Sequence, residues 1–177
     1  GIFRNLTAAP TASFNSITIN NTSVGGVTFA GTTNIATQPS NSISVSGTLT
    51  FTAGRVFTSG GASFVLGVST PAVGTLSYTA GGFASGVVFG RWFTAGGTGS
   101  AFTAGVDASN TTSRYPFVDA NGQGRSTWIE RTSPAGAAGV LGIMYTNVAG
   151  TTSGTYTDGA TNLDTKANDY WTVSSLS

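Results

Sequence analysis

The chain has 177 residues and a formal net charge of +1, and charged residues make up only 7% of it, against about 25% in an ordinary soluble domain. It contains no histidine and no cysteine, which excludes disulfides, thiolate catalysis, cysteine-ligated metals and the commonest general base. The few basic residues are scattered, so the composition argues against nucleic acid or an anionic membrane as a partner, and no apolar run approaches the roughly 18–20 residues of a membrane span.

The N-terminal segment, residues 1–12, is apolar at Ile2, Phe3 and Leu6. It has two interpretations: a first strand that pairs inside the domain, or an arm that docks into a neighbouring copy and adds a strand to its sheet. The segment has neither an initiator Met nor the basic and apolar regions of a signal peptide. We therefore expect a processed chain or a fragment of a longer precursor.

From residue 13 onward, apolar and polar residues alternate. Ile17 and Ile19 fall on one face of a strand, and the stretch 43–51 keeps a period of two that is broken only at Gly47. This alternation, with many β-branched and aromatic residues, is typical of half-buried strands. Residues 13–80 repeat short apolar pairs separated by Ser, Thr, Asn and Gly.

The same pattern continues to the end of the chain. Further strands are predicted at 55–59, 62–68, 74–79, 84–93, 100–106, 114–119, 125–131, 140–146, 154–157 and 169–175. Gly-Gly and Asn-Gly pairs between them indicate turns. We expect one all-β domain over residues 13–177, a jelly-roll-like β-sandwich with short β-solenoid character in its N-terminal half and a change of character near 81–82; two sub-domains are the alternative.

Candidates for chemistry are few. Without histidine a Ser-His-Asp triad is excluded, and Glu130 is interpreted as an ion-pair partner of its neighbours Arg125 and Arg131 rather than as a glycosidase carboxylate. No cofactor and no firm metal site are predicted. A weak calcium candidate is the polar stretch 158–164, with Asp158, Asn162 and Asp164.

Aromatic residues offer a second candidate site. Trp92, Tyr115 and Trp128 could form a platform for a glycan, or they could pack in the core as aromatic residues of β domains commonly do. Trp92 lies in the exposed-looking stretch 91–93, Arg-Trp-Phe. Four asparagines in Asn-x-Ser/Thr sequons are candidates for glycosylation: Asn5, Asn20, Asn21 and Asn110.

Several phrases resemble the repetitive extracellular proteins of Bacteroidota that are exported by the type IX secretion route. The matching stretches are residues 17–20, 26–29 and 45–54, the strand-like 81–93, the segment 113–130, and the closing phrase Asn-Asp-Tyr-Trp-Thr-Val-Ser-Ser at 168–175. The sequence departs from the family at Arg125, which is followed by Ser-Thr-Trp rather than Pro-Val-Thr, and no C-terminal secretion domain follows Ser177. The resemblance implies a secreted or cell-surface protein and implies no catalytic residues.

These observations lead to two functional hypotheses. The first is a non-enzymatic extracellular structural protein that builds a filament, sheath or surface layer by strand exchange between copies of itself. The alternative is a surface adhesin or carbohydrate-binding module that uses the aromatic platform. A structural subunit should assemble without any ligand, whereas a lectin should remain monomeric and respond to glycans.

Overall fold

The computed structural model describes residues 11–30, 42–69, 72–93, 114–129, 139–158 and 161–175. The described residues form strands and no helix, which confirms the all-β prediction, and they therefore offer no helix that could cross a membrane. The strands are β1 (Thr11–Asn21), β2 (Val27–Ala30), β3 (Ser42–Ser59), β4 (Ser63–Leu66), β5 (Thr75–Tyr78), β6 (Gly82–Phe83), β7 (Val88–Phe93), β8 (Arg114–Tyr115), β9 (Thr127–Trp128), β10 (Gly139–Thr146), β11 (Thr151–Asp158), β12 (Thr161–Ala167) and β13 (Tyr170–Ser175).

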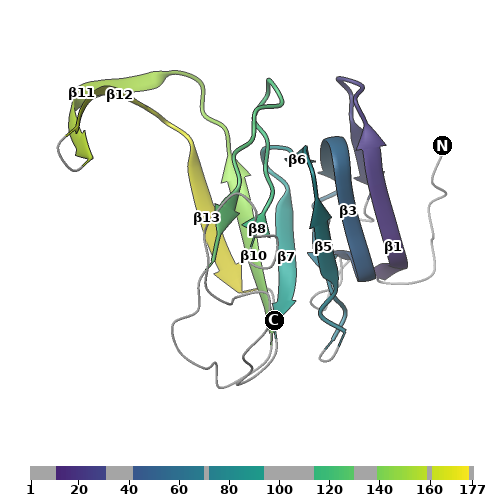
Figure 1. The fold of residues 1–177 in the computed structure, drawn as a ribbon. Helices are drawn as coiled ribbons and strands as arrows, with labels where there is room; N and C mark the ends of the chain where they lie inside the picture. Colours follow the sequence, from purple (N-terminus) through teal and green to yellow (C-terminus); the bar gives the residue numbers. More distant parts are fainter. Residues whose placement is uncertain are drawn as a thin grey trace.

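Residues 11–83 form a parallel coil whose middle turn is the long strand β3 (Figure 1). Strands β1 and β2 pair with one side of β3, and β4, β5 and β6 pair with the other side, all in parallel. Strands β1 and β2, then β3, then β4 to β6 are thus successive turns of one coil. Stacked parallel turns that each contact only their neighbours are the arrangement of a β-solenoid.

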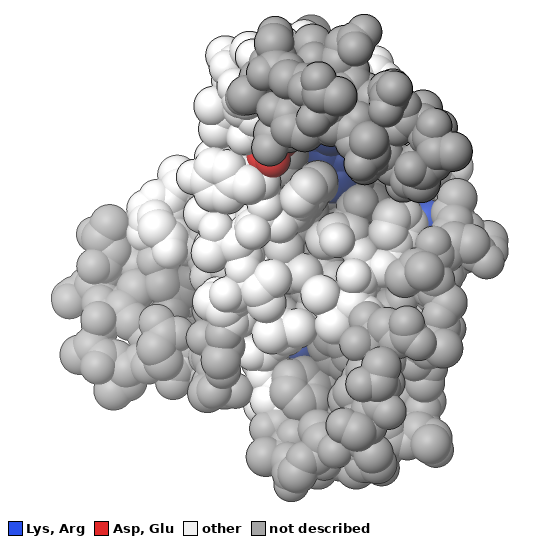
Figure 2. Space-filling model, turned by 90° about the vertical axis from the view of Figure 1, so that its left-hand side faces the viewer, with Lys and Arg blue, Asp and Glu red and all other residues white. Residues whose placement is uncertain are grey.

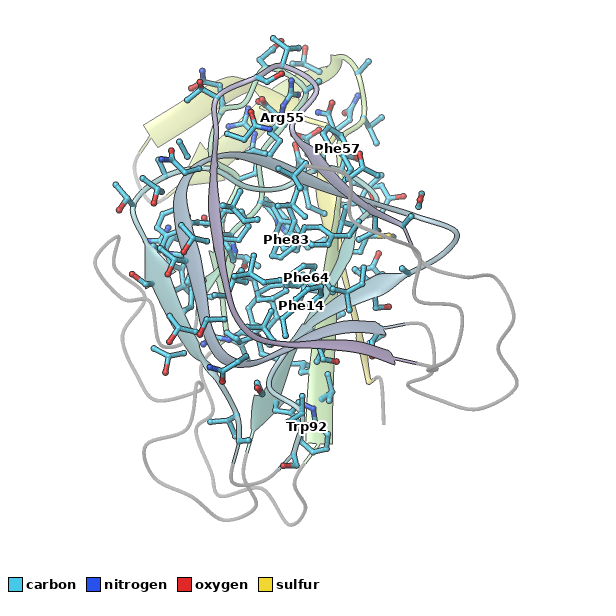
Figure 3. All side chains as sticks on the ribbon, turned by 90° about the vertical axis from the view of Figure 1, so that its right-hand side faces the viewer. Phe14, Arg55, Phe57, Phe64, Phe83 and Trp92 are labelled. Carbon is cyan, nitrogen blue, oxygen red and sulfur yellow. The ribbon has the colours of Figure 1, made fainter. Side chains whose placement is uncertain are left out.

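Each turn has three walls. Along β3 the paired stretches are 42–45, 48–51 and 55–59, and the pairing with β1 shifts its register between the first two stretches and again after the second. We call these stretches and their partners the first, second and third walls. Figure 3 shows the ribbon bending around an enclosed cluster of side chains, with Phe14, Phe64 and Phe83 inside it.

Apolar residues of successive turns stack in ladders that face this interior. Three of them are Ile17–Leu49–Leu76 in the second wall, Val27–Val56–Phe83 in the third and Ile43–Phe64–Phe89 in the first. The alternation of the sequence produces these ladders, because every second residue of a strand points to the same face.

Phe83 lies at the centre of the core and has no exposed surface. Its ring centroid is 5.2 Å from that of Phe51, 5.0 Å from that of Phe64 and 4.4 Å from that of Phe89, on which it stacks. These separations are those of favourable aromatic pairs. The contacts of Phe83 with these three rings therefore join all three walls into one core.

The corner between the second and third walls requires glycine. Gly54 and Gly81 have φ angles of 103° and 90°, a region that residues with a Cβ rarely adopt. A Cβ on Gly81 would meet the carbonyl oxygen of Gly54, and one on Gly54 would meet that of Asn21. The corners of successive turns thus stack closely because Gly54 and Gly81 carry no side chain toward the turn before them.

Pairing changes from parallel to antiparallel beyond the coil. Strand β7 pairs in parallel with β4, then β10 pairs antiparallel with β7, and β13 pairs antiparallel with β10. The main path of the sheet is β1-β3-β4-β7-β10-β13, so β1 and β13 form its two ends (Figure 1). Strands β8 with β9 and β11 with β12 make two small antiparallel pairs.

The structure therefore contains the solenoid expected for the N-terminal half. The three walls enclose one core, and a jelly-roll-like sandwich is not confirmed, because the described strand pairs of residues 11–83 are all parallel. The parallel pairing also continues past residues 81–82 as far as β7. Strand β1 begins at Thr11, and residues 1–10 of the predicted arm lie outside the described residues.

Candidate functional site

Two arginines are buried where the coil meets the antiparallel part. Arg91 is 2% exposed and occupies the ladder position that Val45 and Leu66 hold in earlier turns. Its Nη1 donates a hydrogen bond to the carbonyl oxygen of Arg114 at 2.8 Å. Burial lowers the pKa of Arg91 to about 10, so the guanidinium stays charged at neutral pH. The prediction that residues 91–93 are exposed to solvent was thus wrong for Arg91.

The Arg114 guanidinium lies between two aromatic rings. Its Cζ is 4.3 Å from the ring centroid of Tyr78 and 4.7 Å from that of Trp128. Such contacts between a cation and the faces of aromatic rings are favourable, and more so where water is excluded. The half-buried Trp128 side chain is thus used to hold a structural arginine.

This geometry does not form the predicted glycan platform. The side chain of Tyr115 has no exposed surface, and its hydroxyl donates to the carbonyl oxygen of Leu141 at 3.1 Å. Burial raises the pKa of this hydroxyl far above its ordinary value. Trp92 is half-buried on β7 and lies away from the labelled phenylalanines in Figure 3. Of the two interpretations offered for Tyr115, core packing is the one that the structure bears out, because a ring inside the core cannot stack on a sugar.

Acidic side chains anchor the chain just before β13. Asp169 accepts a hydrogen bond from the Tyr145 hydroxyl at 2.7 Å and one from the backbone amide of Val148 at 2.9 Å. These two bonds are the main reason that the pKa of Asp169 lies below its usual value. Burial, followed by the bond to Asp169, raises the pKa of Tyr145. The carboxylate therefore fixes where β13 begins.

Arg125 links this anchor to a tight turn. Its guanidinium lies 2.9 Å from a carboxylate oxygen of Asp119 and 3.7 Å from one of Asp169. Asp119 also accepts backbone hydrogen bonds from Asn121 and Gln123 at 2.8 and 2.9 Å. Arg125 was predicted to pair with Glu130, which lies outside the described residues. Both carboxylates thus have structural partners.

Strand β13 exposes large apolar side chains at the end of the sheet. Tyr170 is 51% exposed, Trp171 42% and Val173 55%. Among the described residues β13 pairs only with β10, so its other edge has no strand partner there. The strand contains no charged residue and no proline. Figure 2 views the side on which β13 lies in Figure 1, and its described surface shows only small charged patches.

Strand β1 forms the opposite end and is also uncharged. In the described part of the chain it pairs only with β3, and residues 11–21 contain no charged residue. Phe14 and Ile17 of β1 are only half-buried, although both pack against the core. Exposed edges are normally blunted by charges, proline or bulges. Charge and proline are missing from both ends of this sheet, although bulges interrupt β1.

The remaining predicted sites fall partly outside the described residues. Ile2, Phe3 and Leu6 of the arm, and Asn5 and Asn110 of the sequons, lie outside them. The exposed Asn20 lies on β1, whereas the Asn21 side chain donates to the carbonyl oxygen of Gly26 and accepts from the amide of Ser23. A glycan on Asn21 would leave one N–H on its Nδ2, so it would have to fit beside the bond to Gly26.

The weak calcium candidate lies on a strand pair rather than in a polar loop. Asp158 ends β11, while Asn162 and Asp164 belong to β12. In the register, Asn162 is opposite Thr157 and Asp158 is opposite Thr161. The loop part of the prediction was wrong, and the side chains that would bind calcium lie outside the described part of the structure.

Comparison with known proteins adds no relative. No family model, no curated protein and no solved structure matches the chain. Sequence reasoning missed the apolar edge of β13, because its alternation predicts a half-buried strand wherever it lies in a sheet. The available signal was the absence of charge from residues 170–175.

Proposed function

We propose that this chain is a non-enzymatic structural protein outside the cell, whose copies assemble into a filament, sheath or surface layer. The observation that carries the proposal is the uncharged edge strand β13, with Tyr170, Trp171 and Val173 exposed on it. An edge of this kind is a template for a strand from another chain, whose backbone groups complete the ladder.

Composition supports the same proposal. A net charge of +1 on 177 residues gives little repulsion between copies. The chain has no histidine or cysteine, and the described carboxylates Asp119 and Asp169 are occupied by structural partners. The resemblance to repetitive proteins of the type IX route supports a location on the cell surface or beyond it.

The donor in this proposal is the opposite end of the sheet. Strand β13 of one copy pairs with β1 of the next, and the arm 1–12, with Ile2, Phe3 and Leu6, extends that contact. A contact between two different surfaces is heterologous, so each copy leaves one end open and growth continues as a chain of copies. Assembly then requires no ligand.

The test compares two lysine variants by electron microscopy and sedimentation. Val173→Lys places a charge on the edge of β13, whereas Val68→Lys places the same charge on a residue that is 38% exposed and distant in sequence from both edges. We expect ordered assemblies from the wild type and Val68→Lys, and monomers from Val173→Lys. A wild type that stays monomeric at high concentration, or a Val173→Lys variant that still assembles, would overturn the proposal.

A further inference from the structure

The second wall of the coil presents a regular array of hydroxyl groups to solvent. Strands β1, β3 and β5 run side by side there in strict register (Figure 1). Their outward positions form two rows, which are Ser16, Thr48 and Thr75 in the first and Thr18, Thr50 and Ser77 in the second. We call these six residues the hydroxyl wall. The paired stretches that carry it, 16–19, 48–51 and 75–78, contain no charged residue.

The spacing of the hydroxyl wall follows from its backbone. Neighbouring strands lie about 4.8 Å apart, and alternate residues of a parallel strand lie about 6.6 Å apart. The array is therefore a two-dimensional lattice whose repeats are set by backbone hydrogen bonds. The same ladders that form the core impose it, since Ile17, Leu49 and Leu76 lie between the two rows and point inward.

The hydroxyl wall is rigid. Leu49 and Phe51 behind it have no exposed surface, and threonine side chains have few rotamers because they branch at Cβ. Thr48 and Thr50 in the middle turn are half-buried between their neighbours. The Ser16 hydroxyl also accepts a hydrogen bond from the Thr48 amide at 3.3 Å. Little side-chain freedom would be lost when such a surface binds, which reduces the cost of binding.

The chemistry of the hydroxyl wall matches an ordered lattice of water. Each threonine offers one hydroxyl, which both donates and accepts a hydrogen bond, beside one methyl group. An uncharged array with this spacing, close to the oxygen repeats of ice, can hold water molecules in ice-like positions. A crystalline polysaccharide fits less well, because sugar rings are held by aromatic faces and the outward positions of these stretches are all Ser or Thr.

We propose that the hydroxyl wall is an ice-binding surface, through which the protein adsorbs to growing ice crystals. This inference does not require self-assembly, because ice binding would use the outward hydroxyl groups of the second wall. Ser16 and Thr18 of the wall lie on β1, the proposed donor strand, whereas the other four residues lie on β3 and β5.

The test measures partition of purified protein into slowly grown ice and inhibition of ice recrystallisation. Thr50→Lys places a charge in the middle of the hydroxyl wall. Its matched control is Thr28→Lys, at an exposed threonine of β2 in the third wall. Urea unfolding checks that both variants fold, and Thr75→Lys, at an exposed wall position on β5, replaces Thr50→Lys if that variant does not.

We expect the wild type and Thr28→Lys to enter the ice. Partition of Thr50→Lys into ice should be at least about tenfold lower than that of the wild type. Exclusion of the wild type from ice, as for an inert protein of the same concentration, would overturn the inference. Equal loss in Thr28→Lys and Thr50→Lys would also overturn it. Retention on cellulose or chitin powder instead, abolished by Thr50→Lys, would assign the surface to a polysaccharide. Electron microscopy of the same variants reports assembly separately.

Discussion

Replacement of Phe83 by alanine tests whether the stacked ladders hold the coil together. The Phe83 ring is fully buried and has the rings of Phe51, Phe64 and Phe89 at centroid distances of 5.2, 5.0 and 4.4 Å. A buried Phe→Ala change costs about 3–5 kcal/mol. We expect the upper part of that range, about 4–5 kcal/mol, because three aromatic pairs that each add about 0.5–1.5 kcal/mol are lost together.

Urea unfolding followed by tryptophan fluorescence measures this loss. With a slope near 2 kcal/mol per molar urea for a small domain, the midpoint should fall by about 2 M. The matched control is Phe57→Ala, since Phe57 is only half-buried, near the coil rim (Figure 3), and has the Arg55 guanidinium 5.8 Å from its ring. We expect Phe57→Ala to lower the free energy of unfolding by only about 1 kcal/mol. Equal losses in the two variants would refute the idea that the ladder centre carries the stability.

Three further predictions concern a corner, an anchor and a buried cation. Gly81→Ala should destabilise by about 2–4 kcal/mol, because the new Cβ meets backbone, whereas Gly122→Ala, with a φ of 81° and open space, should cost about 1 kcal/mol; equal costs in thermal unfolding would contradict the stacked corner. The pKa of Asp169 is lowered in the folded state. The ionised carboxylate therefore stabilises the fold fully above about pH 4, and this stabilisation is lost as the pH falls through the pKa of the folded state. Asp169→Asn should therefore reduce the drop in melting temperature between pH 7 and about pH 3, and an unchanged drop would contradict this. Arg114→Gln should alter Trp128 fluorescence and destabilise by about 1–3 kcal/mol, and wild-type stability and fluorescence would count against the stacking.

The strands of this fold are visible in the sequence, but their partners are not. Alternation around Ile43, Val45, Leu49 and Phe51 predicts half-buried strands, and the structure places all four in the core. Period two is the same for parallel and antiparallel half-buried strands, so the pattern alone does not distinguish a solenoid from a sandwich. Whether the strands form a solenoid or a sandwich depends on contacts between residues that are distant along the chain.

The same limit explains the errors at the candidate sites. Arg91 has a polar side chain in a strand-like stretch, and only its register with Leu66 places it inside the coil. Tyr115 is likewise buried by contacts with segments distant in sequence, among them Phe89 at a ring distance of 5.6 Å. The exposure of Trp171 depends on β13 being the last strand of the sheet. Local patterns predict elements, whereas sites depend on the order of those elements.

Hydrogen exchange tests the central claim, that β13 of one copy pairs with β1 of the next, most directly. Amide exchange is compared between dilute monomers and assembled or concentrated protein, with β10 as an internal reference because it is already paired on both sides. The proposal predicts new protection in residues 11–21 and 170–175 together, and none in 139–146. Protection of residues 170–175 alone would indicate a closed dimer through β13, and unchanged exchange at both edges would contradict strand addition altogether.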